Sequence, residues 1–239
     1  MHASRNRQKA AVVLPVPMVA DMTADRTIKF AAIICLVCSM GLAGVKGTLN
    51  AKQEYNKKID QQVNVLKALF PTFTPDGEEI NLKKRDELFT QGQVPKAWIP
   101  KYFDQYVEIK EVDLADGKKG KLYLLKKDDE LRSVAFPAQG KGLWSTVHSY
   151  IGLEPDLATI KGVTFFDHGE TPGLGGECSK PWFQRNFRGK TLLEDGEPAD
   201  FEVVKGKAPE GAEHAVDGMS GATITGNGIE RFLNDTYEN

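Results

Sequence analysis

A run of small and hydroxyl-bearing residues near the C-terminus is the first stretch that could do chemistry. Residues 217–228, DGMSGATITGNG, contain Ser220, Thr223 and Thr225 among four glycines. A hydroxyl oxygen becomes a nucleophile when a partner activates it, and small residues let the backbone approach a ligand closely. The run therefore indicates either a plain turn or a loop whose backbone can come close to a ligand.

Helical spacing directly follows this loop. Ile229, Phe232 and Leu233 fall at positions i, i+3 and i+4 and predict a C-terminal helix. Asn227 and Glu230 have the spacing of a capping box, which predicts that the helix begins there. The free N–H groups and partial positive charge of such an end favour a phosphate.

Two further glycine-rich stretches could face a ligand. In residues 168–177, HGETPGLGGE, His168 and Glu170 are either an acid/base pair or a surface histidine beside a solvated carboxylate. In residues 140–145, GKGLWS, Trp144 either stacks on an aromatic ring or belongs to the core. Neither stretch has the G-x-G-x-x-G pattern with a following helix, so a dinucleotide-binding fold is not supported.

Other kinds of chemistry lack the residues they need. There is no Ser-His-Asp set, P-loop or zinc-ligand spacing, so we expect no catalytic residue and no metal site. The formal net charge of −2 argues against a nucleic-acid partner. Cys35 and Cys38 lie in an apolar run with Cys178 far downstream, which predicts inert, buried thiols rather than a disulfide framework.

The N-terminal part holds one strongly apolar segment, which we interpret as a transmembrane helix over 28–46 after a tail at 1–27. As a helix, residues 28–45 extend about 27 Å, close to the apolar thickness of a bilayer. A signal peptide cleaved near Ala43 and a lipoprotein signal at Cys38 are the alternatives. The flanking basic residues are too balanced to orient the segment. Translation could also begin at Met18 or Met22.

The remainder, 47–239, reads as one soluble domain. An imperfect apolar stripe predicts a helix before Pro71, and alternating segments from Tyr106 onward predict strands. We expect a short helix near 181–187 and strands dominating between the terminal helices. The predicted class is α+β, a largely antiparallel sheet with flanking helices.

The three glycine-rich stretches together resemble a known family. VDGMSGATIT matches the flavinylation motif Asp-x-x-Ser/Thr-Gly-Ala-Thr of covalent FMN-binding proteins. GKGLWS and HGETPGLGG, in this order, resemble the C subunit of the Na⁺-translocating NADH:quinone reductase. The resemblance covers most of the chain after about Ile28 and implies an FMN-binding part at about 130–236.

The resemblance implies a covalent FMN joined through its phosphate to Thr223, and not to Thr225. A separate flavin transferase would make the bond. The implied cofactor-binding residues are Thr223, Ser220, Gly221, Ala222, Leu143, Trp144, Thr171, Leu174 and Gly175. Leu143, Trp144 and Leu174 would give apolar contacts, and Thr171 and Gly175 would give hydrogen bonds to the flavin.

The resemblance also implies partners and a location. The chain would pass electrons between an iron–sulfur centre and a second flavin in other subunits, coupled to Na⁺ export. It would be a single-pass protein of the bacterial inner membrane, with its N-terminus in the cytoplasm and its flavin domain in the periplasm. The alternatives are the flavin subunit of an Rnf-type ferredoxin-oxidising complex and a stand-alone membrane-anchored flavin module.

Overall fold

The computed structural model describes residues 19–70, 80–81, 84, 87, 97–114 and 117–238. The sequence-predicted tail before Val19 lies outside them. The chain divides into two units, 1–54 and 55–239, and each is described by itself.

Helix α1 (Val19–Leu69) is longer than the sequence predicted, because it joins the expected transmembrane helix and the expected following helix without a break. No proline interrupts this stretch, and isolated glycines such as Gly44 weaken a helix without ending it. The helix ends at Leu69, two residues before Pro71, as expected from the sequence.

The segment Asp25–Lys46 of α1 is, among the described residues, the one helix long and apolar enough to cross a membrane, with a mean hydropathy of 2.2. Its apolar side chains are exposed in the chain by itself, which suits contact with lipid. Cys35 and Cys38 are exposed too, so the prediction of buried thiols there is wrong for the isolated chain. The segment is a candidate single-pass anchor.

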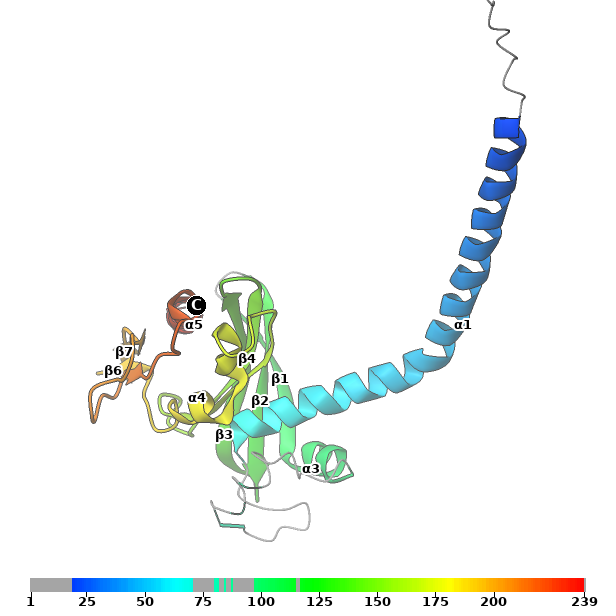
Figure 1. Ribbon diagram of the computed structural model, residues 1–239. Helices are drawn as coiled ribbons and strands as arrows, with labels where there is room; N and C mark the ends of the chain where they lie inside the picture. Colours follow the sequence, from blue (N-terminus) through cyan, green and yellow to red (C-terminus); the bar gives the residue numbers. More distant parts are fainter. Residues whose placement is uncertain are drawn as a thin grey trace, which may run out of the picture. The chain divides into compact units, whose positions relative to one another are not determined.

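Five antiparallel strands form the sheet of the second unit in the order β1-β2-β3-β4-β5 (Figure 1). They are β1 (Val107–Asp113), β2 (Lys119–Lys127), β3 (Glu130–Lys141), β4 (Thr146–Leu153) and β5 (Ile160–Asp167). Each strand pairs with the next along the chain, which matches the strands predicted from alternation.

The sheet separates two hydrophobic clusters. One face packs against α4 (Pro181–Arg185) and α5 (Thr223–Glu238), with Phe165, Phe183 and Phe232 in the cluster. The other face packs against the end of α1 and α3 (Trp98–Tyr106), with Leu66 and Tyr102 in the cluster. Helices thus lie on both faces of the sheet, and Figure 1 shows α4 and α5 on the side opposite α3.

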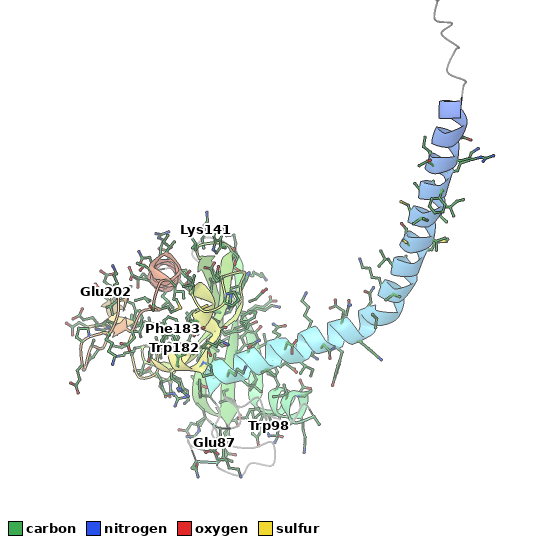
Figure 2. The ribbon with its side chains drawn as sticks, in the orientation of Figure 1. Glu87, Trp98, Lys141, Trp182, Phe183 and Glu202 are labelled. Atoms are coloured by element: carbon green, nitrogen blue, oxygen red, sulfur yellow. The ribbon has the colours of Figure 1, made fainter. Side chains whose placement is uncertain are left out.

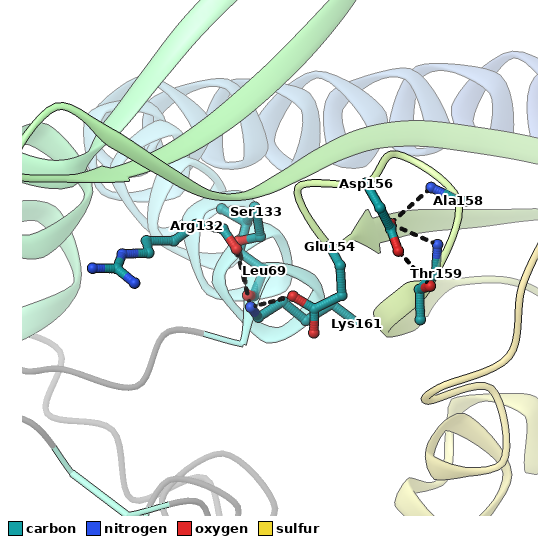
Figure 3. Close-up of polar contacts among 8 residues, drawn as sticks. All are labelled: Leu69, Arg132, Ser133, Glu154, Asp156, Ala158, Thr159 and Lys161. Atoms are coloured by element: carbon teal, nitrogen blue, oxygen red, sulfur yellow. Dashed lines mark hydrogen bonds and ion pairs between the residues drawn. The ribbon is translucent and has the colours of Figure 1, made fainter.

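The end of α1 lies directly against the sheet. The Ser133 hydroxyl donates a 3.1 Å hydrogen bond to the carbonyl of Leu69, one of the last carbonyls of the helix (Figure 3). A Cβ on Gly152 would lie 2.1 Å from the Ala68 carbonyl oxygen, so the contact requires glycine. Residues 55–69 of α1 therefore belong to the core of the second unit.

Short elements connect β5 to α5. They are η1 (Gly175–Ser179), α4, and the small strands β6 (Leu193–Glu194), β7 (Glu197–Pro198), β8 (Glu202–Val203) and β9 (Ala215–Val216). The parallel β8–β9 pair precedes the loop that enters α5. The α+β architecture expected from the sequence, with an antiparallel sheet and flanking helices, is confirmed.

Candidate flavin site

The helix α5 begins at Thr223, four residues before the capping box predicted from the sequence. Asn227 therefore lies inside the helix, and the prediction that the helix starts there is wrong. The Glu230 carboxylate instead accepts a 3.0 Å hydrogen bond from the backbone N–H of Val203 on β8. Spacing predicted that Glu230 accepts the backbone N–H of Asn227, but its partner is a strand that is distant in sequence.

The loop before α5 has an inner and an outer side. Met219 and Ala222 are buried in the core cluster, whereas Ser220, Gly221 and Thr223 are exposed. Gly221 has φ +70°, a backbone conformation that favours glycine, and this turn brings the chain into the first turn of α5. The motif therefore presents Thr223 to solvent as the first residue of a helix of 16 residues.

Thr223 and Thr225 differ completely in their surroundings. Thr225 is 1% exposed, and its hydroxyl donates a 2.6 Å hydrogen bond to Oε2 of Glu170. The side chain of Thr223 is exposed, one residue before Ile224, which is 58% exposed. Of these two hydroxyls, only that of Thr223 is open to an external enzyme.

The Glu170 carboxylate accepts hydrogen bonds from two other segments, the loop at 143–145 and the first turn of α5. We call Glu170 and its four donor residues the Glu170 cluster. Oε1 accepts the backbone N–H of Trp144 at 2.9 Å and of Ser145 at 3.1 Å. Oε2 accepts the N–H of Leu143 at 3.3 Å besides the Thr225 hydroxyl.

Glu170 itself is 5% exposed. The sequence interpretation as a solvated surface carboxylate is therefore wrong, and so is the acid/base pair with His168, since the carboxylate binds other groups. His168 Nδ1 instead accepts the backbone N–H of Glu170 at 3.3 Å. Sequence reasoning missed the role of Glu170; its one signal was a charged residue inside a glycine-rich loop.

Opposing effects act on the Glu170 carboxyl. Burial by itself raises its pKa, but the hydrogen bonds from Thr225, Trp144, Ser145 and Leu143 together hold the pKa below its ordinary value. The group is therefore ionised at neutral pH. Among the ion pairs of the described residues none involves Glu170, so hydrogen-bond donors balance its charge.

Two glycines give the carboxylate its space. A Cβ on Gly142 would lie 2.7 Å from Oε1 of Glu170. A Cβ on Gly175 would lie 2.7 Å from Oε2 and 2.5 Å from the Thr225 hydroxyl oxygen. Real Cβ atoms do not come this close, so both positions require glycine while the Glu170 cluster is formed.

The same packing brings the three predicted stretches together. A Cβ on Gly228, in α5, would lie 2.3 Å from the carbonyl oxygen of Lys141, which Figure 2 labels at the end of β3. A Cβ on Gly221 would lie 2.9 Å from Cδ2 of Leu174. The GKGLWS loop, the HGETPGLGGE loop and the loop entering α5 are thus neighbours.

Large apolar side chains of these segments are exposed. Trp144 is 72% exposed, so it is not a core residue, and Leu143 and Leu174 are 42% and 44% exposed. With Ile224 they supply apolar surface beside the segment that carries the free Thr223 hydroxyl. An aromatic ring system linked to a phosphate matches this combination of apolar surface and helix N-terminus.

Two predicted residues have roles in the turn itself. The Thr171 carbonyl accepts the backbone N–H groups of Leu174 and Gly176, at 3.1 and 3.0 Å, while the Thr171 side chain is exposed. Gly175 is buried and lies against Thr225 and Glu170. The turn thereby holds the Leu174 side chain at the surface, between Thr171 and Gly175 in the chain.

Two cavities among the described residues of the second unit lie away from this site. One of about 290 Å³ is lined by residues of α1, β5 and α4, including Lys67 and Arg185, and by Arg188 just after α4. Another of about 890 Å³ lies over β1 to β4. Neither includes a predicted flavin residue. Across the described ranges, no group of three His, Cys, Asp or Glu side chains could hold a metal ion.

This geometry fits a flavin-binding module, and comparison with known proteins gives the class. Residues 142–238 match the family described as FMN-binding domain. That range begins at the GKGLWS loop and contains the Glu170 cluster and α5.

Relatives along most of the chain have one description. The C subunit of the Na(+)-translocating NADH-quinone reductase of Yersinia pestis is 34% identical over 231 residues, which cover 87% of this chain and 86% of that protein. Its counterpart in Vibrio alginolyticus is 36% identical over 222 residues, covering 82% and 84%. This chain belongs to the family of the C subunit of the Na⁺-translocating NADH-quinone reductase.

Solved structures agree with this assignment. NqrC of Shewanella oneidensis is 30% identical, with a TM-score of 0.52 and coverage of 75% of this chain and 91% of that one. The C subunit of the Parabacteroides distasonis reductase has a TM-score of 0.58 at 24% identity, covering 78% and 92%, and supports the fold.

Proposed function

We propose that this chain is the electron-transfer subunit of a Na⁺-translocating NADH:quinone reductase and carries FMN in phosphoester linkage to Thr223. The assignment of the attachment site rests on the contrast between two threonines of one motif. Thr223 is exposed at the start of α5, whereas Thr225 is buried and hydrogen-bonded to Glu170. A transferase can reach only the first of these hydroxyls.

The residues around Thr223 fit an attached FMN. The first N–H groups of α5 lack helical partners and favour the negative charge of a phosphate. Ser220, Gly221 and Ala222 keep the approach free of bulk. Leu143, Trp144 and Leu174 would contact the ring system, and Thr171 and Gly175 would offer it hydrogen bonds.

Attachment needs a second enzyme, because a threonine hydroxyl is a weak nucleophile. A flavin transferase with Mg²⁺ would use FAD as donor. The bond from Thr223 Oγ1 to the FMN phosphorus would form, the pyrophosphate bond of FAD would break, AMP would leave, and the hydroxyl proton would be lost. Asp217 belongs to the motif that this enzyme would read.

Bound FMN would supply the redox chemistry, accepting and donating single electrons, while the chain binds and orients it. Electrons would come from an iron–sulfur centre in neighbouring membrane subunits and pass to a second covalent flavin, coupled to Na⁺ export. The descriptions of the relatives favour this role over an Rnf-type complex or a stand-alone module.

The division along the chain and its location are parts of the proposal. Residues 28–46 would cross the bacterial inner membrane, after a cytoplasmic tail at 1–27. Residues 47–239 would lie in the periplasm, with the FMN-binding part at about 130–236. The apolar exposed stretch Asp25–Lys46 supports the anchor.

The test is the intact mass of the full chain co-expressed with a flavin transferase. We expect one FMN per chain, lost in Thr223→Val and retained in Thr225→Ser, which keeps the buried hydroxyl. FMN retained by Thr223→Val would overturn the site, and copurification with the other subunits tests the complex.

A further inference from the structure

We propose that Glu170 is a positioning residue of the flavin site. Its carboxylate holds the loop at 142–145, the loop at 170–175 and the first turn of α5 in one arrangement. This inference rests on the proposed FMN at Thr223, because those three segments are the ones that would surround it.

The hydrogen bonds show why one side chain can hold three segments. The donors are separated from Glu170 by 25 to 27 residues on one side and by 55 on the other. All four bonds end on the same carboxylate. A shift of any one segment would therefore break its bond to Glu170, and the carboxylate links the position of each segment to that of the others. The arrangement couples the backbone beneath Trp144 to the first turn that begins at Thr223.

Glu170 acts from beneath the site and not on its surface. It is 5% exposed, whereas Trp144, Leu174 and Thr223 have exposed side chains. A direct contact between the carboxylate and the flavin is not needed for this role. The flavin-facing side chains are fixed because the backbone that carries them is fixed.

The chemistry of the cluster requires a carboxylate. All four partners are donors, three N–H groups and one hydroxyl, and an ionised carboxylate has acceptors only. In Glu170→Gln an NH₂ group would replace one of the two oxygens and face N–H groups that also donate. The substitution changes little volume, so it removes the negative charge and the acceptor at one of the two oxygens and leaves the packing.

The first arm of the experiment uses the full chain made without flavin transferase. Amide hydrogen exchange is compared between wild type, Glu170→Gln and the matched control Glu177→Gln. Glu177 lies in η1 and its carboxylate accepts the exposed Trp182 indole N–H at 2.9 Å, so the control also removes a charge from the same loop.

We expect exchange in residues 142–145, 171–176 and 223–226 to rise about tenfold or more in Glu170→Gln, with the β4 and β5 amides unchanged. Equal exchange in Glu170→Gln and Glu177→Gln would overturn the proposal. Glu170→Gln could also lose protection from exchange throughout the domain. In that case Thr225→Val is compared with Thr225→Ser, because the first removes one of the four donors to Glu170 and the second retains it. Equal exchange in these two variants would then overturn the proposal.

The second arm uses chains that carry FMN. We expect Glu170→Gln and Thr225→Val to shift the flavin midpoint potential and weaken its visible circular dichroism, with Thr225→Ser and Glu177→Gln like wild type. If Glu170→Gln leaves both the midpoint potential and the visible circular dichroism of the flavin unchanged, the positioning role is overturned. A wild-type chain without FMN would instead contradict the proposed function, and the exchange arm would still decide whether Glu170 orders the three segments.

Discussion

The Thr225 hydroxyl lies 2.6 Å from Oε2 of Glu170, a residue 55 positions earlier in the chain. This bond commits one of the two threonines of the motif to the protein interior. Thr223, only two residues away, remains exposed at the helix start. The choice between two similar hydroxyls is therefore made by burial and hydrogen bonding, not by their local sequence.

Replacing Trp144 should change the environment of the flavin without changing its attachment. Trp144 is 72% exposed, so Trp144→Ala should cost little stability. An indole stacked on a flavin quenches its emission, so we expect brighter fluorescence from the covalent FMN and an unchanged intact mass. Trp182→Ala is the control, since Trp182 contacts Phe183 on α4 (Figure 2) and is not a predicted flavin residue. Equal fluorescence in wild type and Trp144→Ala would contradict a flavin contact.

The stability contributed by Glu170 should depend on pH. Its pKa is lower in the folded chain than its ordinary value of 4.5, so the contribution is complete above that value and is lost as pH falls through the folded pKa. We expect wild type to melt at a higher temperature than Glu170→Gln at pH 7, and the gap to narrow in acid below pH 4.5. Thermal unfolding across this range measures the gap; a constant gap would show that ionisation is not involved.

Gly175→Ala should destabilise the second unit. Its Cβ would lie 2.5 Å from the Thr225 oxygen and 2.7 Å from Glu170, and relief of such overlap typically costs about 1–3 kcal/mol. Denaturant unfolding measures the loss. Gly44→Ala is the control for the same added volume, because nothing lies within 4 Å of a Cβ there. Equal stability of the two variants would mean that the Glu170 cluster adjusts freely.

Cys178 should be unreactive in the folded chain. Burial, followed by the nearby Glu170 charge, raises the pKa of its thiol to about 12. In a Cys35→Ser/Cys38→Ser background we expect no iodoacetamide adduct at pH 8 and one adduct after denaturation, both measured by intact mass. An adduct in the native chain would show that the core around Cys178 opens readily.

Removing the apolar helix should release a folded domain from the membrane. A chain starting at Tyr55 retains the compact unit, including the buried residues at the end of α1, and should be soluble with cooperative unfolding. A chain starting at 71 lacks Leu66 and Leu69, each worth about 1.5–3 kcal/mol of burial, and should misfold.

Orientation is tested on the full chain. A reporter fused after Asn239 should be active only outside the cytoplasm. N-terminal sequencing of the mature protein tests the anchor itself, because a chain that begins just after Ala43 would show that the apolar segment is a cleaved signal.

Much of the architecture could be predicted from the sequence. Alternating apolar residues identified the five strands, since period 2 places one face of a strand against a core. The apolar stretch after Ile28 identified the candidate anchor by length and composition. The length of α1 and the start of α5 were not predicted, because the helix continues without a break past residue 46 and the Glu230 carboxylate binds a distant strand.

The sequence by itself determined which residue types meet: glycines, small hydroxyls and a few large apolar side chains in three motifs. Only the tertiary structure decided which threonine is free, which tryptophan is exposed, and that Glu170 is buried. The physical reason is that exposure and hydrogen-bond partners come from segments 25 to 55 residues apart. Local spacing in the sequence does not show which side chains are buried or which groups they bind. The packing of α5 on the sheet decides both.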